Sequence, residues 1–279
     1  MPNMILSHRN RADAATLSGG SWLAARPLSN LQSRFLSKVA RSSDATTAST
    51  LLDCDFGAAM AIRVVALRFT NLSLNATIKI QLRTATAGGG TLVAGHSDFV
   101  AIWPAMYAGS PDRQPTAEEA EDLPKLFLLV LEAEVEARFL RIEIVDTANA
   151  DGYVELSRLW AGPAWQPERN FTYGAEFGLT DDTETSESPA GAVFAGTTRK
   201  RRTMSLSLDW LDLDEGFQQA LDITYRLGQT GQLLACASPD ESDLNRLRTT
   251  MLATLEPSAL SLPQYGISSM KFSFTEVIA

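Results

Sequence analysis

The chain has 279 residues, 45% of them hydrophobic and 20% charged, which suits a globular protein with room for two domains. Its formal net charge of −9 argues against nucleic-acid binding, because contacts to phosphates need a basic surface. No apolar run approaches the roughly 20 residues that a membrane-spanning helix needs. Residues 1–8 lack a basic region followed by an apolar segment, so we expect synthesis in the cytoplasm without a secretory signal.

Strand-like alternation recurs along the chain as far as residue 165. Apolar and β-branched side chains alternate with polar ones, and clusters of turn residues separate the runs. Because no helical pattern interrupts them, these runs predict an antiparallel β-sandwich over residues 1–165. The strands are expected at residues 61–70, 76–83, 138–145 and 153–162.

The segment between Trp103 and Lys125 has a different character. It is rich in proline and acidic residues and too polar to form core, so it predicts a long surface excursion between two strands. Thr116 followed by Glu119 fits a capping box, which indicates one helical turn there.

Prolines 163 and 167 mark a boundary, and residues 166–279 form the second predicted domain. Alternation over 203–210 places Met204, Leu206, Leu208 and Trp210 on one face of a strand. Asp212 then precedes Glu215 by three residues, which predicts a helix that ends at Gly228. Phe217 and Leu221 are expected to pack that helix on the strand. With strands at 232–237, 248–255 and 269–278, this is an α+β domain.

The two cysteines, Cys54 and Cys236, are far apart in the sequence. We expect two free, buried thiols rather than a disulfide, as is usual in a reducing compartment.

Three stretches of the first domain resemble the galactose-binding-like family of discoidin or coagulation-factor type C sandwiches. They are Leu51–Gly57, which resembles the family's strand ending in Asp-Leu-Gly, the strand from Arg138 to Ile144, and the closing strand Val154–Gly162. The resemblance implies a jelly-roll β-sandwich. Some members bind sugars through loops at one end.

The whole chain also resembles tail proteins of tailed phages and prophages. The stretches 162–170 and 210–221 carry this resemblance, as does the turn before Gln232. It implies a tail-tube or distal-tail-like second domain, a β-sandwich or barrel flanked by one helix. It further implies a structural protein of the virion tail tip or baseplate that forms a homo-oligomeric ring at the distal end of the tail tube. The partners would be other copies, the tail tube and baseplate hub proteins.

The sequence shows no constellation typical of an enzyme. His8 and His96 are not paired at metal-ligand spacing, no Cys-x-x-Cys or Gly-x-Ser-x-Gly occurs, and Gly88–Gly90 lacks the lysine of a phosphate loop. The carboxylates cluster in polar loops, where a solvated surface is their ordinary role. We therefore expect no catalysis, no metal and no cofactor.

Two sets of residues are candidates for binding. If the chain is instead a carbohydrate-binding module for a host-surface glycan, Trp103 and Tyr107 are the candidate contacts, although packing is the ordinary role of such aromatic residues. For a ring, the basic run Arg199, Lys200, Arg201 and Arg202 would meet Asp181 and Asp182 of a neighbouring copy. The alternative for this second set is pairing within one chain.

Overall fold

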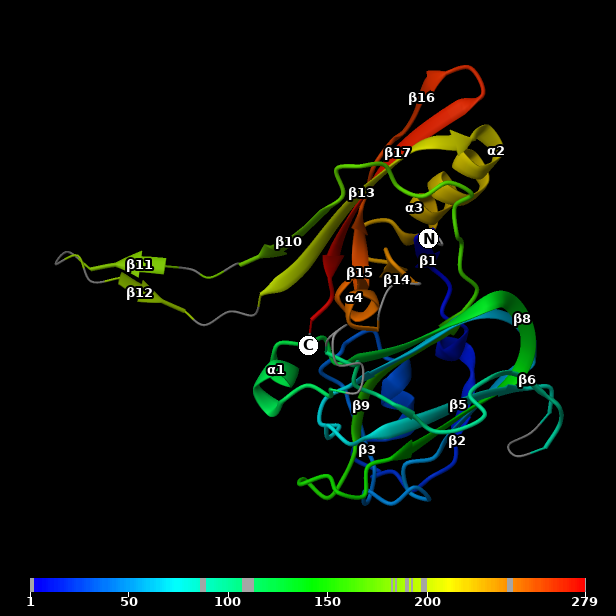
Figure 1. Ribbon diagram of the computed structural model, residues 1–279, viewed down its shortest axis with the longest axis vertical. Coiled ribbons are helices and arrows are strands. Elements are labelled where there is room, and N and C mark those ends of the chain that lie inside the picture. The colour runs from blue at the N-terminus through cyan, green and yellow to red at the C-terminus, as the bar shows by residue number, and fades with distance from the viewer. Residues whose placement is uncertain are drawn as a thin grey trace.

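The computed structural model describes residues 3–85, 89–106, 113–181, 183, 185–188, 191, 193–196, 200–239 and 243–278. Strands take up 46% of the structure and helices 14%, so the predicted mainly-β class is confirmed. Two large sheets carry the fold, one in the first domain and one in the second (Figure 1).

The first sheet has eight strands and curls over itself into a sandwich. Two long strands, β4 (Leu52–Phe69) and β8 (Leu126–Val145), run through the bend, and register shifts within their pairing allow them to turn. The shorter strands complete the two layers in the order β3-β9-β4-β8-β5-β6, with β2 on β4 and β7 on β5. They are β2 (Thr16–Ser18), β3 (Ala40–Arg41), β5 (Thr77–Arg83), β6 (Leu92–Gly95), β7 (Val100–Ala101) and β9 (Glu155–Gly162).

The strands predicted in this domain are all present, and their alternating residues form its core. Ile78, Ile80 and Leu82 are fully buried, as are Ile142 and Ile144 on β8. Helix α1 (Ala117–Glu121) begins at Thr116 with both hydrogen bonds of the predicted capping box. Two short 3₁₀ helices, Arg11–Ala14 and Leu28–Gln32, pack against β9.

The second sheet has the order β1-β14-β15-β17-β13-β10, with β16 also paired to β17. Its strands are β1 (Ile5–Ser7), β10 (Glu176–Thr180), β13 (Arg201–Asp212), β14 (Gln232–Cys236), β15 (Thr250–Glu256), β16 (Leu260–Gln264) and β17 (Ile267–Glu276). A two-stranded ribbon of β11 (Thr185–Glu187) and β12 (Val193–Ala195) extends from it. The predicted strands and helix of this domain are therefore present.

The N-terminal strand β1 was not predicted, and it belongs to the second sheet although it precedes the sandwich in the sequence. It pairs with β14, and Leu6 forms a bridge with Trp165. Ser7 Oγ accepts a hydrogen bond from Trp160 Nε1 and donates one to the Pro163 carbonyl oxygen. Gly162 is also required here, because a Cβ on it would lie 2.0 Å from the Arg9 carbonyl oxygen. The chain thus passes between the two sheets twice, after β1 and after β9, and these two connecting segments lie side by side.

The helix of the second domain starts and ends where predicted, but a different face is buried. It runs continuously through α2 (Leu213–Glu215), a π-helical stretch (Gly216–Leu221) and α3 (Asp222–Leu227), with a short helix α4 (Asp243–Arg248) later in the chain. Asp212 caps it and Gly228 ends it at a φ of 53°. The prediction for Phe217 is wrong, since its side chain is half exposed. Gly216, Ala220 and Ile223 face the sheet instead.

The predicted burial of Trp210 is also wrong. Met204, Leu206 and Leu208 are buried as expected, but the pairing of β13 with β17 shifts register between Leu208 and Leu211. Leu211 takes the next buried position, and Trp210 is left 52% exposed.

Both cysteines are free and buried, as predicted. Burial, with the nearby Asp55 and Asp53 charges, raises the pKa of Cys54 to about 12, so this thiol stays protonated.

Candidate functional site

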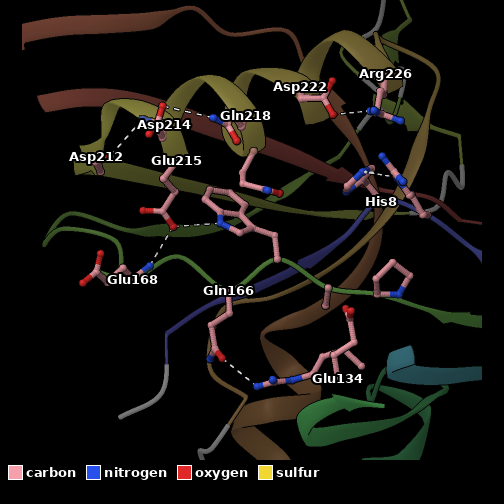
Figure 2. A pocket seen from close by; sticks show the side chains of 16 residues that line it. His8, Glu134, Gln166, Glu168, Asp212, Asp214, Glu215, Gln218, Asp222 and Arg226 are labelled. Carbon is pink, nitrogen blue, oxygen red and sulfur yellow. Dashed lines mark hydrogen bonds and ion pairs between the residues drawn. The ribbon is translucent and has the colours of Figure 1, made fainter. Parts of the chain in front are cut away.

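A cleft of about 1020 Å³ lies between the two domains (Figure 2). Strands β4 and β8 of the sandwich contribute Arg63 and Glu134. The linker 163–168 forms the floor, and the helix that begins after Asp212 forms the opposite wall. The cleft therefore exists only because the chain folds its two domains against each other.

Hydrogen bonds hold the linker in place within this cleft. Glu215 Oε1 accepts one from Trp165 Nε1 at 3.1 Å and another from the backbone N–H of Glu168 at 3.0 Å. Arg63 Nη2 donates to Gln166 Oε1 at 3.0 Å. One carboxylate on the helix and one guanidinium on the sandwich thus clamp the linker from both sides.

The charges of the cleft are mostly negative. Among the described residues that line it, the carboxylates of Glu134 and Glu168 have neither a hydrogen bond nor an ion pair. Burial lowers the pKa of His8 to about 4, with further lowering by the positive charges of Arg9 and Arg226. His8 is therefore neutral at neutral pH, and its Nε2 accepts a hydrogen bond from Arg9 Nε at 3.2 Å. Polar, uncharged or cationic ligand groups suit this surface.

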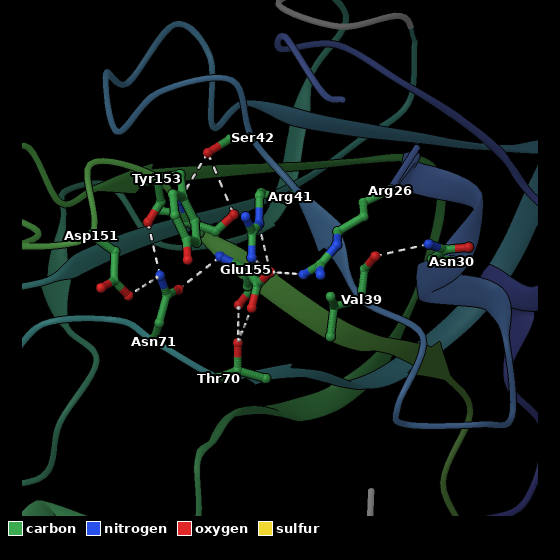
Figure 3. Close-up of polar contacts among 11 residues, drawn as sticks. Arg26, Asn30, Val39, Arg41, Ser42, Thr70, Asn71, Asp151, Tyr153 and Glu155 are labelled. Atoms are coloured by element: carbon green, nitrogen blue, oxygen red, sulfur yellow. Dashed lines mark hydrogen bonds and ion pairs between the residues drawn. The ribbon is translucent and has the colours of Figure 1, made fainter. Parts of the chain in front are cut away.

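A second polar cluster lies among loops of the sandwich (Figure 3). Glu155 accepts hydrogen bonds from Arg26, from Arg41 Nε at 2.6 Å and from Thr70 Oγ1 at 3.3 Å. The Arg41 guanidinium also stacks on the Tyr153 ring, 3.9 Å from its centroid. Because these groups bind one another, the cluster fixes the loops and offers little capacity for a ligand.

The third feature is an arm, defined here as β10, β11, β12 and the paired start of β13. It projects from the second sheet, away from both domains (Figure 1). All five residues of β10 are exposed, and so are the large apolar side chains Phe177, Leu179 and Phe194. An edge strand and a two-stranded ribbon have no core of their own.

The two predicted glycan contacts are not brought together as a site. Trp103 is only 5% exposed, because its ring packs edge-on against Phe69 and its Nε1 donates to the Ser73 carbonyl oxygen at 2.8 Å. That environment is a core position and does not fit a glycan platform. Tyr107 lies outside the described residues.

The predicted interface residues are only partly described. Arg199 and Asp182 lie outside the described residues. Asp181 and Lys200 are exposed where the β10–β13 pairing ends, and Arg201 is half-buried there. Arg202 is bound within its own chain, since its guanidinium pairs with Glu276 at 2.6 Å and its Nη1 donates to the Arg248 carbonyl oxygen. Arg202 thus has partners within its own chain, and its contact with a neighbouring copy stays a prediction.

Sequence reasoning missed the cleft. In the sequence, Trp165 lies between the two boundary prolines and Glu215 gives a helix-start signal, and nothing indicates that the two residues meet. Within the described part of the chain, no group of three or more His, Cys, Asp and Glu residues is arranged to hold a metal ion. No helix among these residues is long and apolar enough to cross a membrane.

No family model matches this chain, and no curated protein matches it. Solved structures similar to it are carbohydrate-binding modules of galactose-binding-like type, the family that three stretches of the first domain resemble. One is a module, CBM32-1, of a family 31 glycoside hydrolase from Clostridium perfringens. It has 12% identity and a TM-score of 0.38, with 56% of this chain and 99% of that one covered.

Two further structures give the same result. The family 32 module of C. perfringens NanJ, in complex with galactose, has 14% identity and a TM-score of 0.38, with 56% of this chain and 98% of that one covered. A Streptococcus pneumoniae fucose-binding module has 12% identity and a TM-score of 0.39, with 56% and 95% covered. Galactose and fucose are ligands of those modules. None of the three is a phage tail protein.

Proposed function

We propose that this chain is a non-catalytic structural subunit of a phage tail tip, in which copies contact one another through the arm. The observation that carries the proposal is the arm itself. It exposes Phe177, Leu179 and Phe194 on strands that no other described part of the chain covers. Exposed apolar groups on an unpaired strand edge favour association with another chain.

The resemblance of residues 162–170 and 210–221 to phage tail proteins supplies the kind of assembly. In such a protein the second domain would lie in a ring at the end of the tail tube, and the sandwich would lie outside it. Adjacent tube and hub proteins would be its partners, and the virion its final location.

Electron microscopy of the purified chain at high concentration tests this proposal. We expect closed rings in which the arm of each copy contacts the next one, since repeated head-to-tail contacts close into rings. Particles that remain single copies at every concentration, or rings whose arms point freely into solvent, would contradict it.

Carbohydrate recognition is a second candidate function, and the chemistry of the interdomain cleft favours it. The cleft combines Trp165 with free carboxylates and with the amides Gln166 and Gln218. A few polar groups placed around an aromatic surface are typical of small-molecule sites. A glycan array with the full chain tests this function, and no retention on any glycan would contradict it. The two candidate functions are compatible in one protein.

A further inference from the structure

The exposure of Trp210 on β13 is the starting point. Leu208 and Leu211 are both 1% exposed, so the register shift between them moves Asp209 and Trp210 out of the alternation and leaves the indole half in solvent. A bulge of this kind re-aims a side chain, and bulges are over-represented beside functional sites.

Two hollows adjoin the Trp210 side chain. One, of about 230 Å³, also includes Asp209, Pro263 and Gln264 in its lining. The other, of about 220 Å³, includes Glu168, Arg169 and Asp212 in its lining. Trp210 and Ile267 line both hollows, so the two hollows adjoin at these residues.

The second hollow adjoins the interdomain cleft. Glu168 and Asp212 line both, and Figure 2 shows these two residues on the linker and at the start of the helix. We treat these three adjoining hollows together and call them the Trp210–Trp165 groove. It runs from Trp210 past Glu168 to Trp165, whose indole is held by Glu215.

The lining decides which chemistry fits the groove. A purely apolar partner would bury the carboxylates of Asp209, Glu168 and Asp212 without new hydrogen bonds, which is costly. A polyanion would be repelled by them. A ligand that has apolar faces for the two indoles and many hydroxyl donors for the carboxylates avoids both costs. The carboxylates of Asp209 and Asp212 can accept further hydrogen bonds beyond those from Thr172 and from the Asp214 backbone.

We propose that the Trp210–Trp165 groove binds a linear, uncharged glycan chain, with one sugar ring against Trp210 and later rings entering the cleft. This inference rests on the second candidate function above and gives it a site. The site lies on the second domain, the linker and the side of the sandwich that faces the cleft, and it does not include Trp103 of the sandwich core.

Fluorine NMR of the full chain labelled with 5-fluorotryptophan tests the proposal. The chain has five tryptophans, and the variants Trp210→Phe and Trp165→Phe assign two of the resonances. The probes are the hexasaccharides of cellulose, chitin and maltose, each with its monosaccharide. We expect at least one hexasaccharide to shift the Trp210 and Trp165 resonances with one Kd and to bind more tightly than its monosaccharide, because it fills more of the groove.

Two variants make a matched pair. Trp210→Ala should weaken binding at least about tenfold, a difference of about 1.4 kcal/mol. Tyr265→Ala should leave the Kd unchanged. This aromatic side chain is fully exposed on the β16–β17 hairpin, which supplies Pro263 and Gln264 to the first hollow, but Tyr265 itself lines neither hollow.

Three results would overturn the proposal. If the chain is retained on a glycan array while the Trp210 resonance stays fixed, carbohydrate recognition stands but its site is elsewhere. If no glycan is bound by either method, the inference and the second candidate function both fail. If no hexasaccharide shifts Trp210 and Trp210→Ala instead lowers the mass of the oligomer, the exposed indole is a protein interface.

Discussion

The two domains differ in how many of their large apolar side chains are exposed. Among the described residues, five large hydrophobic side chains are exposed in residues 1–165 and nine in the shorter second domain, although both have well-packed cores. The nine are Tyr173, Phe177, Leu179, Phe194, Trp210, Phe217, Tyr225, Leu262 and Tyr265.

The difference reflects how completely the rest of the chain covers each of the two sheets. The sandwich curls its sheet so that the strands cover each other's apolar faces. The second sheet is covered by its helix on one part of its surface, while β10, the ribbon and the β16–β17 hairpin extend past that cover. The core of the sandwich continues onto Leu234, Cys236 and Leu252 of the second domain, which also carries surface that a ligand or another chain would complete.

The largest expected effect contrasts two phenylalanines of the second domain. Phe272→Ala should lower the free energy of unfolding by about 3–5 kcal/mol, because the ring is fully buried and stacks against Phe274. Phe194→Ala on the arm should change it by less than about 0.5 kcal/mol. Urea unfolding of both variants at concentrations where the chain is a monomer checks this, and a large loss for Phe194→Ala would then mean that the arm packs within its own chain.

An ion pair of the sandwich between a buried arginine and an exposed aspartate should give the next effect. Arg158 is 2% exposed, and both terminal nitrogens of its guanidinium bind Asp13. Asp13→Asn should cost about 3 kcal/mol, because it leaves a buried charge without its counter-ion. The matched control is Asp55→Asn, which breaks an exposed pair with Arg138 and should change the urea midpoint little. Equal effects of the two substitutions would contradict this account.

The helix of the second domain should show a smaller contrast. Phe217→Ala should cost about 1 kcal/mol or less, since half of the ring is already in water. Ile223→Ala on the opposite face should cost about 2–5 kcal/mol. The thermal midpoints of the two variants check the assignment of the buried face. A reversed order would mean that the helix packs by the Phe217 face.

The smallest expected effect is the pH dependence contributed by His8. Its pKa is about 4 in the folded chain and 6.5 for the free group, so the unfolded state binds more protons between these values. Stability should therefore fall as the pH drops from 6.5 toward 4. His8→Gln should lose less stability over that window in urea titrations. The same slope in both proteins would show that His8 is not buried as described.

Local pattern was enough to predict most strands, because alternation of Met204, Leu206 and Leu208 or of Ile78, Ile80 and Leu82 reflects one buried face. It failed at Trp210, since a bulge depends on how β13 pairs with β17, far along the chain. The placement of β1 in the second sheet is non-local for the same reason.

The candidate sites were harder to predict than the strands. Trp103 borders a polar segment in the sequence, yet its packing against Phe69 is visible only in three dimensions. The cleft joins Arg63, Glu134, Trp165 and Glu215 from four separate stretches. Single residues at such spacings leave no pattern in a sequence.

Sedimentation equilibrium of the full chain and of one arm variant tests the central claim most directly. The variant replaces Phe177, Leu179 and Phe194 with serine, and Phe35→Ser, an exposed aromatic position of the sandwich, is the control. We predict that the wild type and the control form an oligomer of defined size. The arm variant should sediment at the monomer mass of 30.3 kDa with a nearly unchanged melting temperature. An arm variant that assembles as the wild type does would contradict the claim that the arm joins the copies.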